Sequence, residues 1–576
     1  MTTWLAGLVA AGCAGRDYQG NPSGSGGSGS GGSGNTSGGA DGGVLGLSTT
    51  LAAADPCTSN APGPRKLWRL SAPAFAASIH SIFNDTSSAA PVATVFSDPT
   101  VLGFSIDANA LLVQDLNASQ LEDNAEAIAA WAGSSGQLTQ FASCASSTTG
   151  APSSSCATSF IQAFGRAAFR TSFTSSDARI ASYSKIFMLG SSNSDGAQAV
   201  VSAMLQSPYF LYRSELGTKD GGSTFTLTPY EVASELAYTL TGTTPDSTLL
   251  AAADSVSGGS LSMSDMIDQQ ASRLVASSGP NSSVAVMGFM NGWLGLPRLF
   301  TTAHDATVYQ IASTVQNEMQ TESQDLIMEA FNGSGTFGSV LTADHSFLNA
   351  DLATFYNIPT NGLGTSFTSV KYAGLTSRDP GLLATGTILN GYARPDEDSP
   401  TQRGHLVRSR MLCQDIPPPP PGLNTTFMPS STPESTRDHF INEHENGVCG
   451  SCHKAMDWIG FAFESYDGWG RYRTTDNGSQ VDDSATIFSD PEGKDDSVTG
   501  LSGSGSLPAF LAGSDDVTHC MERYWTYYTY GSSSWTQDGC TYDSVYKESQ
   551  SNGFALKSTL MAIIHAPNFT TRVQDQ

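Results

Sequence analysis

Five consecutive residues, Cys449-Gly450-Ser451-Cys452-His453, constrain this 576-residue chain more than any other feature. The spacing C-x-x-C-H is the attachment pattern of a c-type haem. Two thiols three positions apart on one turn can form thioethers to the two vinyl groups of one porphyrin. The histidine that follows then lies under the iron and can bind it as the proximal ligand. The motif therefore predicts haem c as the cofactor, held by Cys449, Cys452 and His453.

Two other interpretations of the motif stay open. C-x-x-C is also the pattern of a redox disulfide, although no βαβ pattern surrounds it here. It is also half of a zinc site, although no second C-x-x-C and no histidine pair follows at the spacing of a zinc ribbon. A disulfide or a structural metal would make this a non-catalytic protein rather than a haem protein.

The ligand opposite the proximal histidine decides what a haem does. A filled sixth position implies electron transfer, whereas an open one implies chemistry on O₂ or peroxide. Met456 lies only three residues past His453, on the same turn, so it cannot easily reach the opposite face of the haem. The sequence leaves this ligand unknown, with His444, His405, Met411, Met428 and Met521 as candidates.

The residues after the motif are apolar and then charged. Trp458, Ile459, Phe461 and Phe463 are expected to cover a porphyrin face. Arginines follow, of which Arg471 and Arg473 are either partners of the haem propionates or solvated surface residues. The sequence does not separate these two roles.

The N-terminus indicates export. Residues 1–12 are apolar and end in Ala10-Ala11-Gly12-Cys13, which resembles a bacterial lipobox, so residues 1–13 are expected to be a lipoprotein-type signal with Cys13 lipidated. The stretch departs from the usual pattern because it has no Lys or Arg and is short. It is also too short to span a bilayer, and no other segment is long and apolar enough to do so. We therefore expect a lipid anchor to a membrane, with no transmembrane span.

The cysteine count fits an oxidising compartment. Nine cysteines, less Cys13 and the two of the motif, leave six, an even number that allows three disulfides. Sequence neighbours are the preferred pairs, with buried thiols as the alternative. The expected disulfides are Cys144–Cys156, Cys520–Cys540 and, from the remainder, Cys57–Cys413.

The net charge of −26 argues against a nucleic-acid partner, because little basic surface is available to neutralise phosphates. It suits a soluble, extracytoplasmic protein or one that meets cationic partners.

Most of the chain has helical signals. Ser71 is a good N-cap before apolar residues at helical spacing. Thr228-Pro229-Tyr230-Glu231 has the pattern of a capping box with proline in the first turn, and Gly242 is expected to end that helix. Further helices are expected within 108–133, 263–296, 307–331 and 554–564. The fold class is therefore mainly α, a multi-module helical body with a loop-rich C-terminal c-type haem module.

Composition divides the chain further. A Gly/Ser linker, which behaves as flexible coil, follows the signal. The expected modules are a linker at 14–50, an N-terminal helical module at 64–145, a helical hairpin module at 156–216, a helical module at 225–360, the haem module at 375–490 and a C-terminal helical module at 500–576.

Four passages of the chain resemble one bacterial family. They are Leu67 to Phe83, Ser207 to Arg213, Leu227 to Leu250, and above all the block from Ser399-Pro400 through Arg403-Gly404 and Leu412-Cys413 to Arg473. These passages are similar to the multi-module DUF1587–DUF1595–DUF1592–DUF1588–DUF1585 series, the planctomycete-type cytochrome c proteins. Pro73-Ala74-Phe75 departs from the acidic–aromatic pair usual there, which affects only the first module.

The resemblance implies a secreted or lipid-anchored protein with a haem c site, of a family whose role is not established. It also implies that a histidine is usual at the position of His444.

Three functions follow as hypotheses. The first is an extracytoplasmic monohaem cytochrome-like lipoprotein of the cell envelope, anchored in the outer membrane and facing the periplasm or the exterior. It would exchange electrons with a redox protein or a small-molecule donor or acceptor. The second is a haem-dependent oxidase or peroxidase acting on an extracellular substrate, and the third is a non-catalytic surface interaction protein. No Ser–His–Asp signature, Walker loop or H-E-x-x-H supports a hydrolase, and whether the protein is an enzyme stays open.

Overall fold

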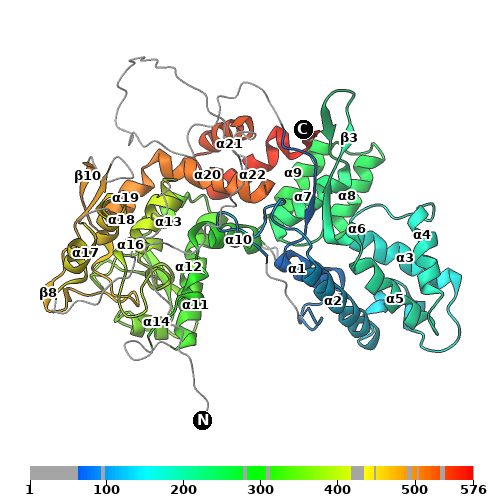
Figure 1. The fold of residues 1–576 in the computed structure, drawn as a ribbon, viewed down its shortest axis with the longest axis horizontal. Helices are drawn as coiled ribbons and strands as arrows, with labels where there is room; N and C mark the ends of the chain where they lie inside the picture. Colours follow the sequence, from blue (N-terminus) through cyan, green and yellow to red (C-terminus); the bar gives the residue numbers. More distant parts are fainter. Residues whose placement is uncertain are drawn as a thin grey trace, which may run out of the picture. The chain divides into compact units, whose positions relative to one another are not determined.

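The computed structural model describes residues 62–92, 98–276, 282–305, 312–414, 416, 434–445, 449–488, 496–502, 505–531 and 539–574. These residues are mainly α-helical, as the sequence predicts, and their strands form sheets of only two or three strands (Figure 1). The lipobox at Cys13, the linker 14–50, the proline run 417–421 and Met428 lie outside the described residues. Within the described part, no helix is long and apolar enough to cross a membrane.

The chain forms two compact units. The described residues of the first, which we call the motif unit, lie within Leu294–Ile327 and Gly338–Cys520. Those of the second, the helical unit, lie within Ala53–Trp293, Met328–Phe337 and Met521–Gln576. The motif unit contains the predicted haem motif. The finer module ranges expected from the sequence stay a prediction.

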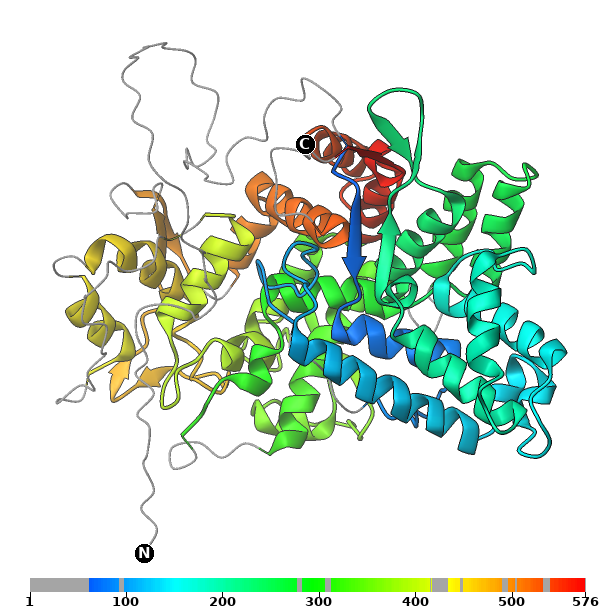
Figure 2. The same cartoon turned by 45° about the vertical axis from the view of Figure 1, so that its right-hand side comes forward.

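The N-terminal part of the helical unit is a bundle built on one apolar core. Its helices are α1 Ala72–Ile82, α2 Asp115–Ser134, α3 Ser154–Phe169, α4 Ala178–Phe187, α5 Asn193–Leu205 and α6 Pro208–Leu211. Ser71 caps α1 by accepting a hydrogen bond from the backbone N–H of Ala74. Phe75, Phe83 and Phe164 are among the buried side chains of this core. Figures 1 and 2 show these helices together.

Further helices and two small sheets complete the helical unit. α7 Pro229–Thr241 begins with the predicted capping box of Thr228 and Glu231, and Gly242 ends it with a positive φ of 66°. The other helices are α8 Ser247–Ser257, α9 Met263–Leu274, all but the last residue of α10 Ser282–Leu294, the part of α20 Asp515–Tyr530 from Met521 onward, α21 Gly539–Ser551 and α22 Leu556–His565. β1 Lys66–Arg69 pairs with β2 Tyr212–Glu215, and β4 Thr224–Thr226 lies between β11 Thr571–Val573 and β3 Thr218–Lys219.

The helix ends differ from the predicted ranges. The range 108–133 becomes helical only at Asp115, and 263–296 contains two helices, α9 and α10, rather than one. Apolar spacing does not mark such interruptions, so boundaries are the weakest part of a prediction from periodicity.

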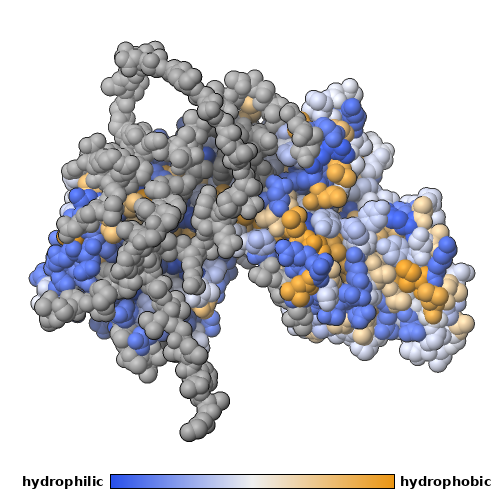
Figure 3. Space-filling view, viewed as in Figure 1, coloured by the Kyte–Doolittle hydropathy of each residue, from blue (hydrophilic) through white to orange (hydrophobic). Residues whose placement is uncertain are grey.

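The surface of the helical unit also carries apolar side chains. Figure 3 shows apolar residues gathered in patches on the drawn face. Leu112, Leu116 and Leu189 are each more than half exposed. Small apolar patches are common on the surfaces of folded domains, so these patches by themselves assign no partner.

The motif unit is built from shorter helices. They are α11 Arg298–Thr301, most of α12 Ser313–Asn332, α13 Phe337–Leu341, α14 Ala350–Phe355, α15 Gly386–Gly391, α16 Pro400–His405, α17 Thr436–His444, α18 Gly450–Gly460 and α19 Ser506–Ala512, with a π-helix at Leu406–Met411. β5 His345–Leu348 pairs antiparallel with β6 Thr368–Lys371, β7 Thr475–Asp476 with β8 Ser479–Gln480, and β9 Ala485–Phe488 with β10 Asp496–Leu501.

Two glycines let α16 and α18 touch backbone to backbone. A Cβ atom on Gly404 would overlap the carbonyl oxygen of Met456, and one on Gly460 would overlap that of Pro400. Any other residue would therefore push the two helices apart. Because α18 carries the C-x-x-C-H motif, the close contact between α16 and α18 fixes the motif against the core of its unit.

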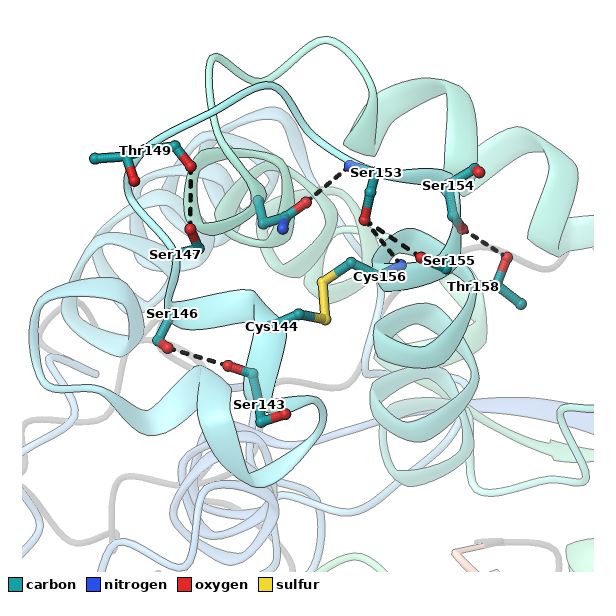
Figure 4. The surroundings of a disulfide bond; sticks show 11 residues. Ser143, Cys144, Ser146, Ser147, Thr149, Ser153, Ser154, Ser155, Cys156 and Thr158 are labelled. Carbon is teal, nitrogen blue, oxygen red and sulfur yellow. Dashed lines mark hydrogen bonds between the residues drawn. A yellow bond between two sulfur atoms is a disulfide. The ribbon is translucent and has the colours of Figure 1, made fainter.

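The disulfides differ in part from those expected. Cys144 and Cys156 are joined, one of the pairs predicted from the sequence, across a Ser/Thr-rich loop (Figure 4). Cys413, however, is joined to Cys520, so the expected pairs Cys520–Cys540 and Cys57–Cys413 are wrong. Cys540 is also disulfide-bonded, and Cys57 lies outside the described residues. Tertiary packing brings Cys413 to Cys520 across 107 positions, which proximity in sequence could not anticipate.

Candidate functional site

The C-x-x-C-H motif forms the first turn of α18. Cys449 is its N-cap, and its carbonyl oxygen accepts hydrogen bonds from the backbone N–H groups of Cys452 at 3.2 Å and His453 at 3.0 Å. Both cysteines are only partly buried, and neither is in a disulfide. The other five cysteines of the described chain, in contrast, are all disulfide-bonded. The two thiols thus share one turn, as attachment to a single porphyrin requires.

A shared carboxylate joins His453 to the last residue of α17. Asp457, one turn after His453 on α18, accepts hydrogen bonds from Nδ1 of His444 at 2.9 Å and from Nδ1 of His453 at 3.1 Å, both at Oδ2. All three side chains are buried. The two imidazole rings lie against each other, with centroids 3.7 Å apart and planes inclined by 35°. The sequence analysis named both histidines but missed Asp457.

The hydrogen bonds to Asp457 keep its carboxyl group charged. Burial alone would raise the pKa of Asp457, but the hydrogen bonds from His444 and His453 outweigh it and hold the pKa below its ordinary value. An ionised carboxylate can only accept, so both Nδ1 atoms carry the proton. For His453, Nε2 is therefore the ring nitrogen that would bind iron.

The same three residues could hold a metal ion. One ligand atom each from His444, His453 and Asp457 lies within 4.8 Å of the others, the one such group in the described part of the chain. Neither thiol of the motif belongs to this group. A zinc site that uses Cys449 and Cys452 together with His453 therefore has no support from this geometry.

His405 and Met411 are the other candidate sixth ligands that the structure describes in the motif unit. His405 shares a hydrogen bond between its Nε2 and Oγ of Ser409 at 3.1 Å. Burial, with Arg410 and Arg298 nearby, lowers the pKa of His405 to about 4. Met411 is buried at the end of the π-helix. Met521 belongs to the helical unit, and Met428 lies outside the described residues. Among these candidates, His444 is the one whose ring the structure shows against that of His453 within the described motif unit.

The arginines after the motif have protein partners. Arg473 forms ion pairs with Asp398, Glu464 and Asp476 at 2.8–3.3 Å. Arg471 pairs with Asp467 at 2.8 Å. These contacts favour a structural role over a role as partners of haem propionates.

The apolar run after the motif joins the core of the unit. Ile459, Phe461 and Phe463 are buried. Trp458 donates from Nε1 to Oε1 of Glu445 at 2.6 Å, which ties the end of α17 to α18. These residues, which follow the motif in sequence, therefore anchor the C-terminal end of α18 in the core of the unit.

The residues present fit a covalently bound haem c. The donor set consists of two thiols on one turn and a histidine whose Nδ1 is hydrogen-bonded to a carboxylate. A metal-binding histidine commonly donates its second ring N–H to a carboxylate, which fixes the tautomer and the orientation of the ring. The fold and site thus define a class: a mainly α, multi-module protein with a C-x-x-C-H helix in its C-terminal part.

Three family models match the chain. Residues 156–215 match PSD5, 227–358 match PSD4 and 379–476 match PSCyt3, described as proteins of unknown function DUF1595, DUF1592 and DUF1588. The chain therefore belongs to the multi-module DUF series of planctomycete-type cytochrome c proteins that its sequence resembles, whose role is not established. The name PSCyt3 suggests a cytochrome-like module. No curated protein and no solved structure matched.

Proposed function

We propose that this protein is an extracytoplasmic, c-type cytochrome-like protein that carries one haem at Cys449, Cys452 and His453 and transfers electrons through it. The observation that carries the proposal is the contrast among the cysteines. Five described cysteines are disulfide-bonded, whereas the two on the first turn of α18 are not, although they are close enough in sequence to pair. Within the described chain these two cysteines are the ones outside a disulfide, which suits attachment to another group.

The residues of the site have distinct roles in this proposal. Cys449 and Cys452 attach the porphyrin, and His453 binds the iron through Nε2. Asp457 holds the proton on Nδ1 of His453. A bound haem would supply a one-electron couple at its iron.

The setting of the protein belongs to the same proposal. Disulfides such as Cys144–Cys156 and Cys413–Cys520 persist in oxidising compartments. With Cys13 lipidated, the protein would be an outer-membrane lipoprotein facing the periplasm or the exterior. Its partner would be a redox protein or a small-molecule electron donor or acceptor.

The experiment is covalent haem content in protein matured in a host with cytochrome c assembly. Intact mass and a pyridine haemochrome spectrum of denatured protein should show one haem per chain. The double substitution Cys449→Ala and Cys452→Ala should abolish it. Cys144→Ala with Cys156→Ala is the matched control, because it removes a disulfide-bonded cysteine pair of the helical unit and should leave the haem in place. Wild-type protein without added haem mass would overturn the proposal.

Haem-dependent oxidase or peroxidase activity on an extracellular substrate is a second candidate. The observation in its favour is that the His444 ring lies against the His453 ring, so with a haem held at His453 this histidine would not serve as its sixth ligand. Rapid CO binding to the reduced protein would favour this candidate over electron transfer alone.

A structural metal is a third candidate, favoured by the ligand atoms of His444, His453 and Asp457. It would make the protein a non-catalytic interaction protein. Elemental analysis of protein that carries no haem decides this candidate, since one bound metal per chain would support it.

A further inference from the structure

We infer that Asp457 is the positioning residue of the proximal side, that it lowers the reduction potential of the iron, and that His444 is its second partner on that same side rather than the sixth ligand. This inference rests on the proposed haem at His453. It assigns to Asp457 and His444 roles that the motif itself does not define.

The first argument is the contact between the two rings. Two axial ligands of one haem have the iron and the porphyrin plane between them, so their rings cannot touch. The rings of His444 and His453 have centroids only 3.7 Å apart, and both donate to the same oxygen, Oδ2 of Asp457. With a haem held at Nε2 of His453, His444 would therefore lie on the same side of it as His453.

The second argument is that the position of His444 is fixed from several directions. Arg437, at the start of α17, donates to the backbone carbonyls of Asp482 and Ser484. Phe440 packs edge-on against the His444 ring, with centroids 5.0 Å apart. The residue after His444 is Glu445, which accepts the hydrogen bond from Trp458 of α18. To reach the opposite face of a haem, His444 would have to break contacts at both ends of its helix.

The third argument is chemical. A carboxylate that accepts the Nδ1 proton makes the imidazole a more basic ligand. It also places a full negative charge one ring away from the metal. Both effects stabilise the ferric state over the ferrous state, so the intact hydrogen bond lowers the reduction potential. The second hydrogen bond, from His444, orients the carboxylate toward His453 and balances part of its charge.

The test is a redox titration of haem-loaded protein with four variants. Asp457→Asn keeps the shape of the side chain but removes its charge. Asp438→Asn, at an exposed position of α17, is the control for an equal change of charge. His444→Gln tests the second partner, and His439→Gln, a buried histidine of the same helix, is its control.

At a fixed potential, we expect Asp457→Asn to raise the ferrous-to-ferric ratio at least tenfold, which corresponds to about 59 mV for one electron. Asp438→Asn should change the ratio less than threefold. His444→Gln should keep the spin state and the CO reactivity of the wild type, as His439→Gln should.

Two results would overturn the inference. One is a change of spin state or new CO binding in His444→Gln alone, which would make His444 the sixth ligand. The other is an equal shift in Asp457→Asn and Asp438→Asn. If Asp457→Asn does not mature, the spectrum of His444→Gln still decides the placement of His444. Haem content of the wild type is measured first, so that a failure of the proposed haem function is recognised separately.

Discussion

Arg403 offers the sharpest test of how the motif unit holds its shape. Its side chain is only 1 % exposed, and it donates four hydrogen bonds to backbone carbonyls. The acceptors are the carbonyl oxygens of Leu389, Phe463, Tyr466 and Asp467, at 2.8–3.2 Å. One guanidinium thus joins α15 to the turn that follows the haem-motif helix. Arg403→Lys keeps the charge but removes the planar fork.

The expected loss follows from the number of carbonyls left without a donor. Lysine has a shorter side chain that ends in one compact ammonium group, so we expect at least two of the four hydrogen bonds to be lost. Each buried acceptor left unpaired costs about 1–3 kcal/mol, which gives a loss of about 2–6 kcal/mol in the free energy of unfolding. This is a large fraction of the roughly 5–15 kcal/mol that a folded domain possesses.

The assay is urea unfolding followed by circular dichroism, with Arg471→Lys as the matched control. Arg471 also binds Asp467, but its side chain is 50 % exposed, and an ion pair of that kind is worth about 0–1 kcal/mol. We expect Arg403→Lys to lower the unfolding midpoint clearly and Arg471→Lys to leave it nearly unchanged. Equal midpoints for the two variants would refute the role assigned to the buried guanidinium.

Two further predictions concern a disulfide and a buried acid. Replacing Cys413 and Cys520 by serine should destabilise the protein by about 2 kcal/mol more than replacing Cys144 and Cys156, because the loops span 107 and 12 positions and chain entropy grows with loop length; similar losses in urea unfolding of the two double variants would contradict this. Burial raises the pKa of Asp379 from 3.8 to about 6, so folding favours the protonated form of this carboxyl group. The free energy of unfolding of the wild type should therefore fall as the pH rises from about 4 to about 6, by at most about 3 kcal/mol. Asp379→Asn should lack that loss, and a wild-type-minus-variant difference in stability that does not change between pH 4 and pH 7 would refute the assignment.

Local signals in the sequence were sufficient for many helix starts. Thr228 and Glu231 form the capping box that their spacing predicts, and Ser71 caps α1. Such signals involve atoms within one turn, so they depend little on the rest of the fold. The Cys144–Cys156 bridge is similar, because only 12 positions separate its ends. Cys413–Cys520 could not be predicted in this way, since its geometry depends on how distant helices pack.

The candidate site shows the same limit. The motif placed Cys449, Cys452 and His453 on one turn, and the structure has that turn. Asp457 follows His453 by four positions, a spacing that puts both side chains on one face of a helix, so a signal for it was present. The place of His444 had no such signal. Whether α17 brings its last residue to the near side or the far side of His453 depends on tertiary contacts such as the one between Glu445 and Trp458.

Buried arginines within the matched block from 379 to 476 fix the backbone around the motif. Arg403 and Arg408 are fully buried and donate hydrogen bonds to backbone carbonyls. The acceptors of Arg408 are the carbonyl oxygens of Ala455 and Phe488. Together with the contact of Gly404 against α18, these arginines fix the helix that begins at Cys449. Side chains used in this way specify a backbone geometry around one helical turn rather than a substrate. The two buried arginines and Gly404 therefore hold in place the turn that carries Cys449, Cys452 and His453, through contacts within the motif unit.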